Sequence, residues 1–211
     1  MQTFLFDFDG TLVDSMPVYA DMMLGILHEF HVAHEESVIK TITPLGYRGA
    51  AKHFISMGLD MPEDDLVRLM HERAVHAYST RVMEKPFVTD ALRALHARGD
   101  RLNVLTASPH AMLDPCLTRL GIFDLFDHVW SCEDFSMTKS EPAIYAEAAK
   151  RIGRPVDEIW FLDDNPGADA AAKAAGMRVC GVYDDSSAEY EQEMRRICDA
   201  YITDFSQLEA L

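Results

Sequence analysis

Short apolar segments alternate with amphipathic helical patterns along most of this chain. Four of these segments predict strands that are buried on both faces, and they have the sequences TFLFDF (3–8), RLNVLT (101–106), EIWFL (158–162) and RVCGV (178–182). Shorter strands are predicted at His128–Trp130 and Tyr201–Ile202, the latter at a sheet edge. Helical patterns of about ten residues separate the later strands and end at glycines. Such alternation predicts an α/β fold with a parallel sheet and right-handed crossovers.

Residues 16–83 show only the helical period. One apolar stripe predicts a helix from Met16 to about Glu29, a second predicts a helix at 48–57, and a third begins after Pro62. Because this span contains no strand pattern, we expect an all-helical insertion at 16–83. The α/β core is then made of residues 1–15 and 84–211.

Composition limits the classes of partner. The chain has 211 residues, of which 48% are hydrophobic, with a net charge of −16 and a pI near 4.8. This charge argues against nucleic acids and anionic membranes as partners, and no apolar stretch approaches the ~20 residues that span a bilayer. The four cysteines form no C-x-x-C pair, and the first strand begins without a signal-peptide pattern. We therefore expect a cytoplasmic protein with reduced cysteines, as a monomer or small homo-oligomer.

Two acids stand at the carboxyl end of the first predicted strand. Asp7 and Asp9 are separated by one residue, so in an extended chain they point to the same side and repel unless a cation lies between them. Gly10 permits a tight turn after them, and Thr11 follows. Open α/β sheets hold their ligands at the carboxyl ends of their strands, so the two acids indicate a ligand site. The alternative interpretation is a capped turn after an edge strand.

Further polar groups follow the other strands. Strand 101–106 ends in Thr106-Ala107-Ser108, a hydroxyl and free N–H groups at a helix start, which is a typical anion site. Strand 158–162 runs into Asp163-Asp164, and Lys139 precedes another helix. The carboxyl ends of parallel strands meet at one edge of a sheet, so these groups are candidates for one site.

These residues resemble the four motifs of the haloacid dehalogenase superfamily. DFDGTLVDS (7–15) matches the first motif, D-x-D-G-T-[LV]-x-D-S, and the strand ending in Thr106 is similar to the second. KSEPAIY (139–145) resembles the third, K-P-x-P-x-x-[FY], with Ser140 in place of the first proline. FLDDN (161–165) resembles the fourth. All four occur in order, and the insertion after the first motif resembles the helical cap of the β-phosphoglucomutase-like and phosphoglycolate phosphatase-like branch.

The resemblance implies a Rossmann-like core and a phosphoryl transfer in two steps. Asp7 would attack phosphorus and form an aspartyl-phosphate, and Asp9 would act as general acid and then general base. Mg²⁺ would be held by Asp7, the backbone carbonyl of Asp9, and Asp164, an all-oxygen set that suits it. The family often has a further acid four residues after its metal ligand. Here Ala168 stands at that position and Asp169 follows it, so the roles of Asp163 and Asp169 stay open.

The phosphate itself would be held by a second group of residues. The resemblance assigns this role to Lys139, the Thr106 hydroxyl and the Ala107 N–H, with Ser108 beside them. In the helical insertion, Arg48 is a candidate for binding the part of the substrate that is not hydrolysed, or else is a solvated arginine at a helix start.

The predicted activity is the hydrolysis of a small soluble phosphomonoester. Dehalogenases of the family lack the second acid, which argues against halide displacement. Mutases of the β-phosphoglucomutase type bear a histidine near the start of the cap, where this chain has Tyr19. A phosphomutase and a non-catalytic sensor of phosphate metabolites remain the alternatives. His28, His31 and His34 recur at intervals of three, as a solvated helix end or a metal site.

Overall fold

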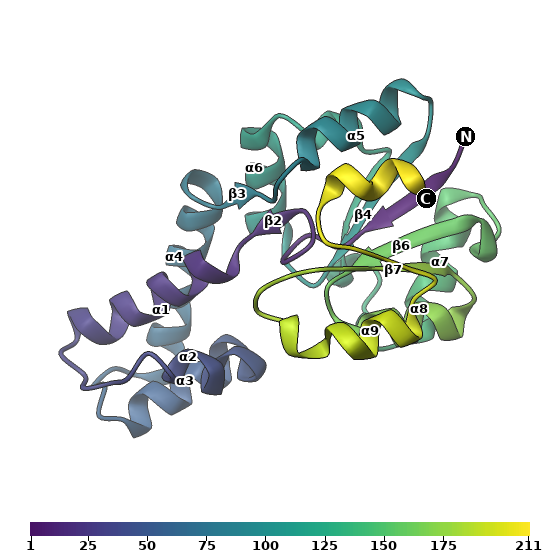
Figure 1. The fold of residues 1–211 in the computed structure, drawn as a ribbon. Helices are drawn as coiled ribbons and strands as arrows, with labels where there is room; N and C mark the ends of the chain where they lie inside the picture. Colours follow the sequence, from purple (N-terminus) through teal and green to yellow (C-terminus); the bar gives the residue numbers. More distant parts are fainter. The chain divides into compact units, whose positions relative to one another are not determined.

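The chain forms two compact units, which are described separately. A computed structural model describes residues 1–211, with the side chain at position 210 left out (Figure 1). The α/β unit comprises Met1–Asp14 and Met83–Leu211, and the helical unit comprises Ser15–Val82. No described helix is both long and apolar enough to span a membrane.

The α/β unit is built on a six-stranded sheet of parallel strands in the order β5-β4-β1-β6-β7-β8. The first strand lies in the interior of this sheet, where Phe6 pairs with Val104 on one side and Leu162 on the other. All four residues of β1 are buried, so the predicted two-faced burial and parallel pairing are confirmed. The strand bounds are β1 (Thr3–Phe6), β4 (Arg101–Thr106), β5 (His128–Ser131), β6 (Ile159–Asp163), β7 (Arg178–Val182) and β8 (Ala200–Ile202).

Helices cover both faces of the sheet, with α5 and α6 on one side and α8 and α9 on the other (Figure 1). Successive side chains of β1 point to opposite faces of the sheet, so they pack into the apolar core on each face. Phe6 packs near the rings of Phe126 and Phe205, while Leu5 joins the cluster formed with Tyr145 and Phe161. The helix bounds are α5 (Val88–Ala97), α6 (His110–Leu120), α7 (Pro142–Ile152), α8 (Pro166–Ala175) and α9 (Glu191–Ile197).

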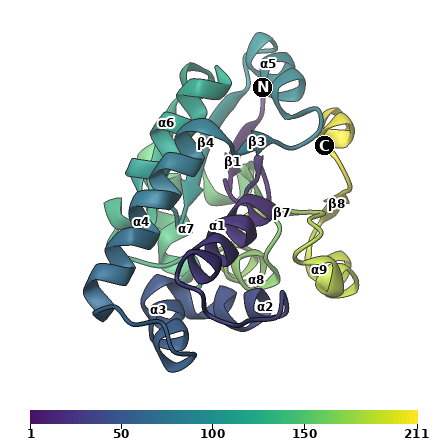
Figure 2. The same cartoon turned by 90° about the vertical axis from the view of Figure 1, so that its left-hand side faces the viewer.

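The helical unit contains four helices, and α1 lies beside α4 (Figure 2). Pro62 stands before the first turn of α4, and the acids Glu63, Asp64 and Asp65 in that turn complement the helix dipole. The helices α1, α3 and α4 occur where the sequence predicts them, and α2 is additional. Their bounds are α1 (Met16–Glu29), α2 (Val38–Ile42), α3 (Gly46–Ser56) and α4 (Glu63–Thr80).

Two predictions about local structure are wrong. The insertion was expected to be helical to residue 83, but β2 (Val13–Asp14) pairs antiparallel with β3 (Met83–Glu84). A strand of two residues is too short to show a periodic pattern, and the two paired strands are distant from each other in the sequence. The acidic segment 184–199 is also less helical than expected. The Asp184 carboxylate accepts the N–H of Ser186 and stabilises a turn, so the helix α9 begins only at Glu191.

Candidate active site

The predicted site residues of the α/β unit gather at the carboxyl ends of β1, β4 and β6. Asp7 follows β1, Thr106 ends β4 and Asp163 ends β6, and these three strands are neighbours in the sheet. A cavity of about 380 Å³ lies at this edge. Its lining includes Asp7, Asp9, Ala107, Lys139, Asp164 and Asn165.

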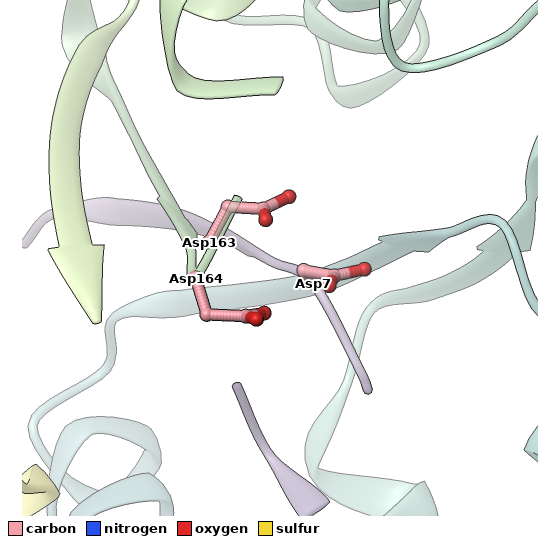
Figure 3. Close-up of side chains that lie close together, drawn as sticks. All are labelled: Asp7, Asp163 and Asp164. Atoms are coloured by element: carbon pink, nitrogen blue, oxygen red, sulfur yellow. The ribbon is translucent and has the colours of Figure 1, made fainter. Parts of the chain in front are cut away.

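Three carboxylates lie close together at this edge of the sheet (Figure 3). Asp7, Asp163 and Asp164 each place one oxygen within 4.8 Å of the other two. Asp7 and Asp163 are buried and Asp164 is half-buried. The resemblance to the family motifs named Asp7 and Asp164 as metal ligands but left the role of Asp163 open.

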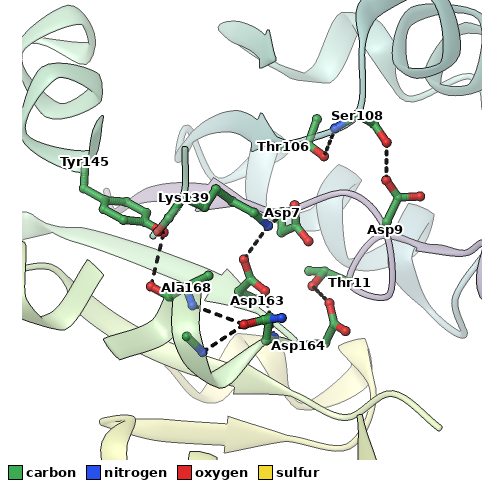
Figure 4. A network of polar contacts seen from close by, with 12 residues as sticks. Asp7, Asp9, Thr11, Thr106, Ser108, Lys139, Tyr145, Asp163, Asp164 and Ala168 are labelled. Carbon is green, nitrogen blue, oxygen red and sulfur yellow. Dashed lines mark hydrogen bonds and ion pairs between the residues drawn. The ribbon is translucent and has the colours of Figure 1, made fainter. Parts of the chain in front are cut away.

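Lys139 is the cation of this cluster. Its ammonium lies 2.6 Å from Asp7 Oδ1 and donates to Asp163 Oδ2 at 2.7 Å (Figure 4). Asp163 Oδ1 accepts the N–H of Asn165 at 2.8 Å, so both oxygens of Asp163 are engaged. The buried hydroxyl of Tyr145 lies 2.8 Å from the Lys139 carbonyl and thereby fixes the loop that carries the lysine. Tyr145 is the last residue of the pattern K-x-x-P-x-x-Y. Its place in this pattern is the sequence feature that could have indicated its contact with the lysine loop.

Burial and mutual repulsion make the acid cluster electrostatically unfavourable. The pKa of Asp7 is raised to about 7, first by burial and then by repulsion from Asp163, against the attraction of Lys139. The pKa of Asp164 is raised well above its usual value, again by desolvation and then by Asp163. Burial opposes the charge of Lys139, but Asp163 and Asp7 outweigh it and raise its pKa. The three acids carry more negative charge than one ammonium balances.

A divalent cation fits these residues. Their ligand atoms are carboxylate oxygens, which Mg²⁺ prefers, and added positive charge would lower the raised pKa values of Asp7 and Asp164. Asp163 is less suited to the metal because Lys139 and Asn165 already occupy both of its oxygens. The residues present therefore fit Mg²⁺, with Asp7 and Asp164 as the side chains that would hold it.

Asp9 does not join the three acids, although an extended chain would place it on the side of Asp7. The strand ends at Phe6, and the Asp9 carboxylate accepts a hydrogen bond of 2.5 Å from the hydroxyl of Ser108 (Figure 4). The N–H of Ser108 donates to Thr106 Oγ1 at 3.1 Å. Of the predicted phosphate ligands, Ala107 and Lys139 line the cavity, whereas Ser108 contacts Asp9. That contact depends on side-chain geometry, which left no signal in the sequence.

The turn after Asp9 lies directly against Asp164. Gly10 has φ +77°, and a Cβ at this residue would lie 2.6 Å from the Asp164 carboxyl carbon. The Thr11 hydroxyl contacts Asp164 Oδ1 at 3.3 Å. Glycine is therefore required here both for the backbone conformation and for the close approach.

The remaining candidates lie elsewhere. Arg48, in the helical unit, is exposed and forms ion pairs with Glu63 at 2.6 Å and Asp64 at 3.0 Å. Asp169, on α8, is fully buried and accepts a hydrogen bond from the Cys198 thiol. The metal-site clusters found among the described residues include neither Asp169 nor the histidines at 28, 31 and 34.

Stability should depend on pH through His110, at the start of α6. Its ring nitrogens lie 2.9 Å from Asp114 and 2.8 Å from Asp134, whose carbonyl also accepts from Arg151. The hydrogen bonds that His110 donates to Asp114 and Asp134 raise its pKa above 6.5. The charged imidazole therefore stabilises the fold below that value, and this contribution is lost as pH rises through the raised pKa.

We expect His110→Gln to lower the melting temperature more at pH 6 than at pH 9, as measured by thermal unfolding of both proteins. A difference that is equal at the two pH values would contradict the charged pairing.

Comparisons with known proteins show the family of this chain. A family model described as haloacid dehalogenase-like hydrolase matches residues 1–176. A phosphoglycolate phosphatase of Salmonella typhi is 33% identical, over 84% of this chain and 79% of that protein.

Two solved structures share the fold. A Thermotoga maritima protein assigned as a β-phosphoglucomutase superposes with a TM-score of 0.85 at 20% identity, covering 99% of this chain and 96% of the other. A Haemophilus somnus protein assigned as a phosphoglycolate phosphatase gives a TM-score of 0.82 at 22% identity, covering 100% and 97%.

Proposed function

Since this chain belongs to the haloacid dehalogenase-like hydrolases, we propose that it is a Mg²⁺-dependent phosphatase acting on a small phosphomonoester through an aspartyl-phosphate. The observation that carries the proposal is the buried Asp7 carboxylate at the end of β1, in a cavity that also contains Lys139 and Asp164. A buried nucleophile beside a cation is what phosphoryl transfer requires, since the reaction depends on positioning and charge stabilisation.

The first step is attack of a carboxylate oxygen of Asp7 on phosphorus, in line with the leaving oxygen. Asp9 donates a proton to that oxygen as the bond to phosphorus breaks, so the alcohol leaves neutral. Water then attacks the aspartyl-phosphate, and Asp9 accepts its proton, which releases inorganic phosphate and restores both acids. The hydroxyl of Ser108 keeps the Asp9 carboxylate in one orientation between these events.

Lys139 and the start of α6 stabilise the phosphoryl group. The ammonium faces Asp7, so it also faces the oxygens of a phosphoryl group bound to Asp7. The Ala107 backbone lines the same cavity and offers its N–H at a strand-to-helix junction. Asp7, Asp164 and the Asp9 carbonyl would hold Mg²⁺, which would neutralise negative charge on the phosphate. Asp163 orients Lys139 through the contact at 2.7 Å.

Relatives suggest the substrate class. Several relatives at 32–33% identity are phosphoglycolate phosphatases, so small phosphorylated carboxylic acids come first, followed by sugar phosphates and nucleoside monophosphates. A phosphomutase stays as the enzymatic alternative, because a β-phosphoglucomutase shares the fold. Tyr19, in place of the mutases' histidine, favours hydrolysis.

The proposal is tested by phosphate release from a panel containing these compounds and p-nitrophenyl phosphate. Hydrolysis supports a phosphatase. Isomerisation of a sugar phosphate without phosphate release would support a mutase, and binding without turnover would support a sensor.

Removal of divalent metal should abolish turnover. We expect excess chelator to remove activity, Mg²⁺ to restore it and Ca²⁺ to inhibit, since Ca²⁺ favours a looser coordination of higher number. The measurement is phosphate release after dialysis, with and without each metal. Full activity in excess chelator would exclude a metal role for Asp7 and Asp164.

Replacement of Arg48 should have a smaller effect on activity, and one that depends on the substrate. If it binds the distal anion of the substrate, it must exchange its pairs with Glu63 and Asp64 for that anion. Arg48→Ala should then raise KM about tenfold for a phosphorylated carboxylic acid, equal to ~1.4 kcal/mol, and leave p-nitrophenyl phosphate unaffected. Arg68→Ala, which removes another exposed arginine paired with an acid of the same helix, is the control. Equal effects on both substrates would contradict recognition of the distal anion.

A further inference from the structure

Lys85 is a nearly buried lysine for which the proposed reaction has no role. It directly follows β3, and its side chain is 12% exposed. The ammonium donates to Asp184 Oδ2 at 2.8 Å, to the Gly10 carbonyl at 2.7 Å and to the Tyr183 carbonyl. An ammonium has three N–H donors, and here each of the three meets an oxygen of the α/β unit.

One of these acceptors belongs to the turn that joins Asp9 to the acid cluster. Gly10 follows Asp9 directly, and its Cα lies so close to Asp164 that a Cβ would overlap the carboxylate. A displacement of the Gly10 backbone therefore changes the position of Asp9 and the space beside Asp164 together. The Gly10 carbonyl is the group that Lys85 holds.

The backbone of Lys85 holds the same turn at a second point. Its N–H donates to the Leu12 carbonyl at 3.0 Å, so main chain and side chain fix the turn from one residue. Asp184 is fixed as well, because its Oδ1 accepts the N–H and hydroxyl of Ser186. Burial raises the pKa of Asp184, but the bonds from Lys85 and Ser186 outweigh it and hold that pKa below its usual value. Asp184 is therefore ionised at neutral pH and can balance the charge of an ammonium.

We propose that Lys85 is a positioning residue for phosphoryl transfer, whose ammonium holds the Gly10 carbonyl and thereby sets the turn that carries Asp9 against Asp164. This inference rests on the proposed function, and it extends the site to a residue outside the four sequence motifs. Asp184 balances the charge of the buried ammonium, while the Gly10 contact transmits its effect.

A purely structural ion pair makes a different prediction. Breaking a buried pair by removing one partner is strongly destabilising, because the other charge is left buried, whereas removing both partners relieves that cost. The free energy of unfolding should therefore fall when Lys85 or Asp184 is replaced alone and recover when both are replaced. If Lys85 positions the turn, kcat should instead follow the presence of the ammonium alone.

The experiment compares Lys85→Met, Asp184→Asn and the double variant, each for denaturant unfolding, kcat, KM and Mg²⁺ affinity by calorimetry without substrate. Lys173→Met is the matched control, since Lys173 pairs with Asp199 in the same unit and its side chain is 42% exposed. We expect Lys85→Met to lose stability and at least tenfold in kcat, with KM changed less than threefold. The double variant should regain stability while kcat stays at least tenfold low and Mg²⁺ binds at least threefold more weakly. Asp184→Asn and Lys173→Met should keep kcat within threefold.

Recovery of kcat together with stability in the double variant would overturn the proposal, as would a kcat for Lys85→Met equal to that of the control. The Mg²⁺ titration separates this outcome from a failure of the proposed function. If the wild-type protein hydrolyses no phosphomonoester, the phosphatase proposal fails, and weakened Mg²⁺ binding in the double variant still supports the positioning role. Unchanged Mg²⁺ affinity in that variant would then count against it.

Discussion

Asp7→Asn is expected to lower kcat by at least about a thousandfold, or ~4 kcal/mol of barrier, while the protein still folds. The amide cannot attack phosphorus, so no aspartyl-phosphate forms. The side chain keeps its size in a buried position, and the substitution removes one of three repelling acids. The melting temperature should therefore stay within a few degrees of the wild-type value or rise.

The measurement is phosphate release and thermal unfolding on the same preparations. Asp157→Asn, which makes the same change at an exposed acid of the α/β unit, is the control and should behave like the wild type. Activity of the Asp7 variant within tenfold of wild type would exclude Asp7 as the nucleophile. If the variant lost its fold together with its activity, unfolding alone would explain the lost activity. A chemical trap for the acyl phosphate on wild-type Asp7 would then decide the assignment.

Asp164→Asn and Asp169→Asn should differ by a large factor in kcat, although both replace an acid that follows β6 in the sequence. Asp164 lines the cavity and belongs to the cluster that fits Mg²⁺. Its substitution should lower kcat at least about 100-fold at low Mg²⁺, or ~2.7 kcal/mol, with partial recovery as Mg²⁺ is raised.

Asp169 lies in a different environment. Its pKa is raised to about 8, first by burial and then by repulsion from Asp163. At neutral pH it is therefore mostly protonated, and asparagine resembles the neutral acid in size and charge. We expect kcat within about threefold of wild type. Activity measured against Mg²⁺ concentration for both variants tests this ranking, and equal losses would place Asp169 among the metal-binding groups.

The sheet was predictable because its strands are continuous apolar runs. The interior strand β1 is buried on both faces, and such a run has few alternatives to a strand in a parallel sheet. The predicted ends of β4, β5 and β6 differ from the observed ones by at most about one residue, since Thr106, Ser131 and Asp163 mark the change to polar turns. The pairing of β2 with β3 was missed, because it joins residues on either side of a long insertion.

The gathering of the site residues was predictable from topology, but their contacts were not. Parallel strands end at one edge, which brings Asp7, Thr106 and Asp163 together. Side-chain rotamers at the turn after β6 decide which carboxylate oxygen faces Lys139. The contact between Asp163 and Lys139 could therefore be recognised only in the structure. Lys85 was overlooked for a related reason: its acceptors are mostly backbone carbonyls, and every residue type has one.

The position of β1 in the sheet has a consequence for biosynthesis. This strand is made first, yet its neighbours β4 and β6 are the second and fourth strands of the sheet along the chain. Thr3 pairs with Arg101 and with Ile159, so its last partner leaves the ribosome roughly 150 residues later, or about 10–30 s at ordinary elongation rates. During that interval FLF lacks its β6 partner throughout, and it also lacks β4 until about 100 residues have followed it. We expect this N-terminal segment, rather than the helical unit, to be the part of the newborn chain that needs a chaperone.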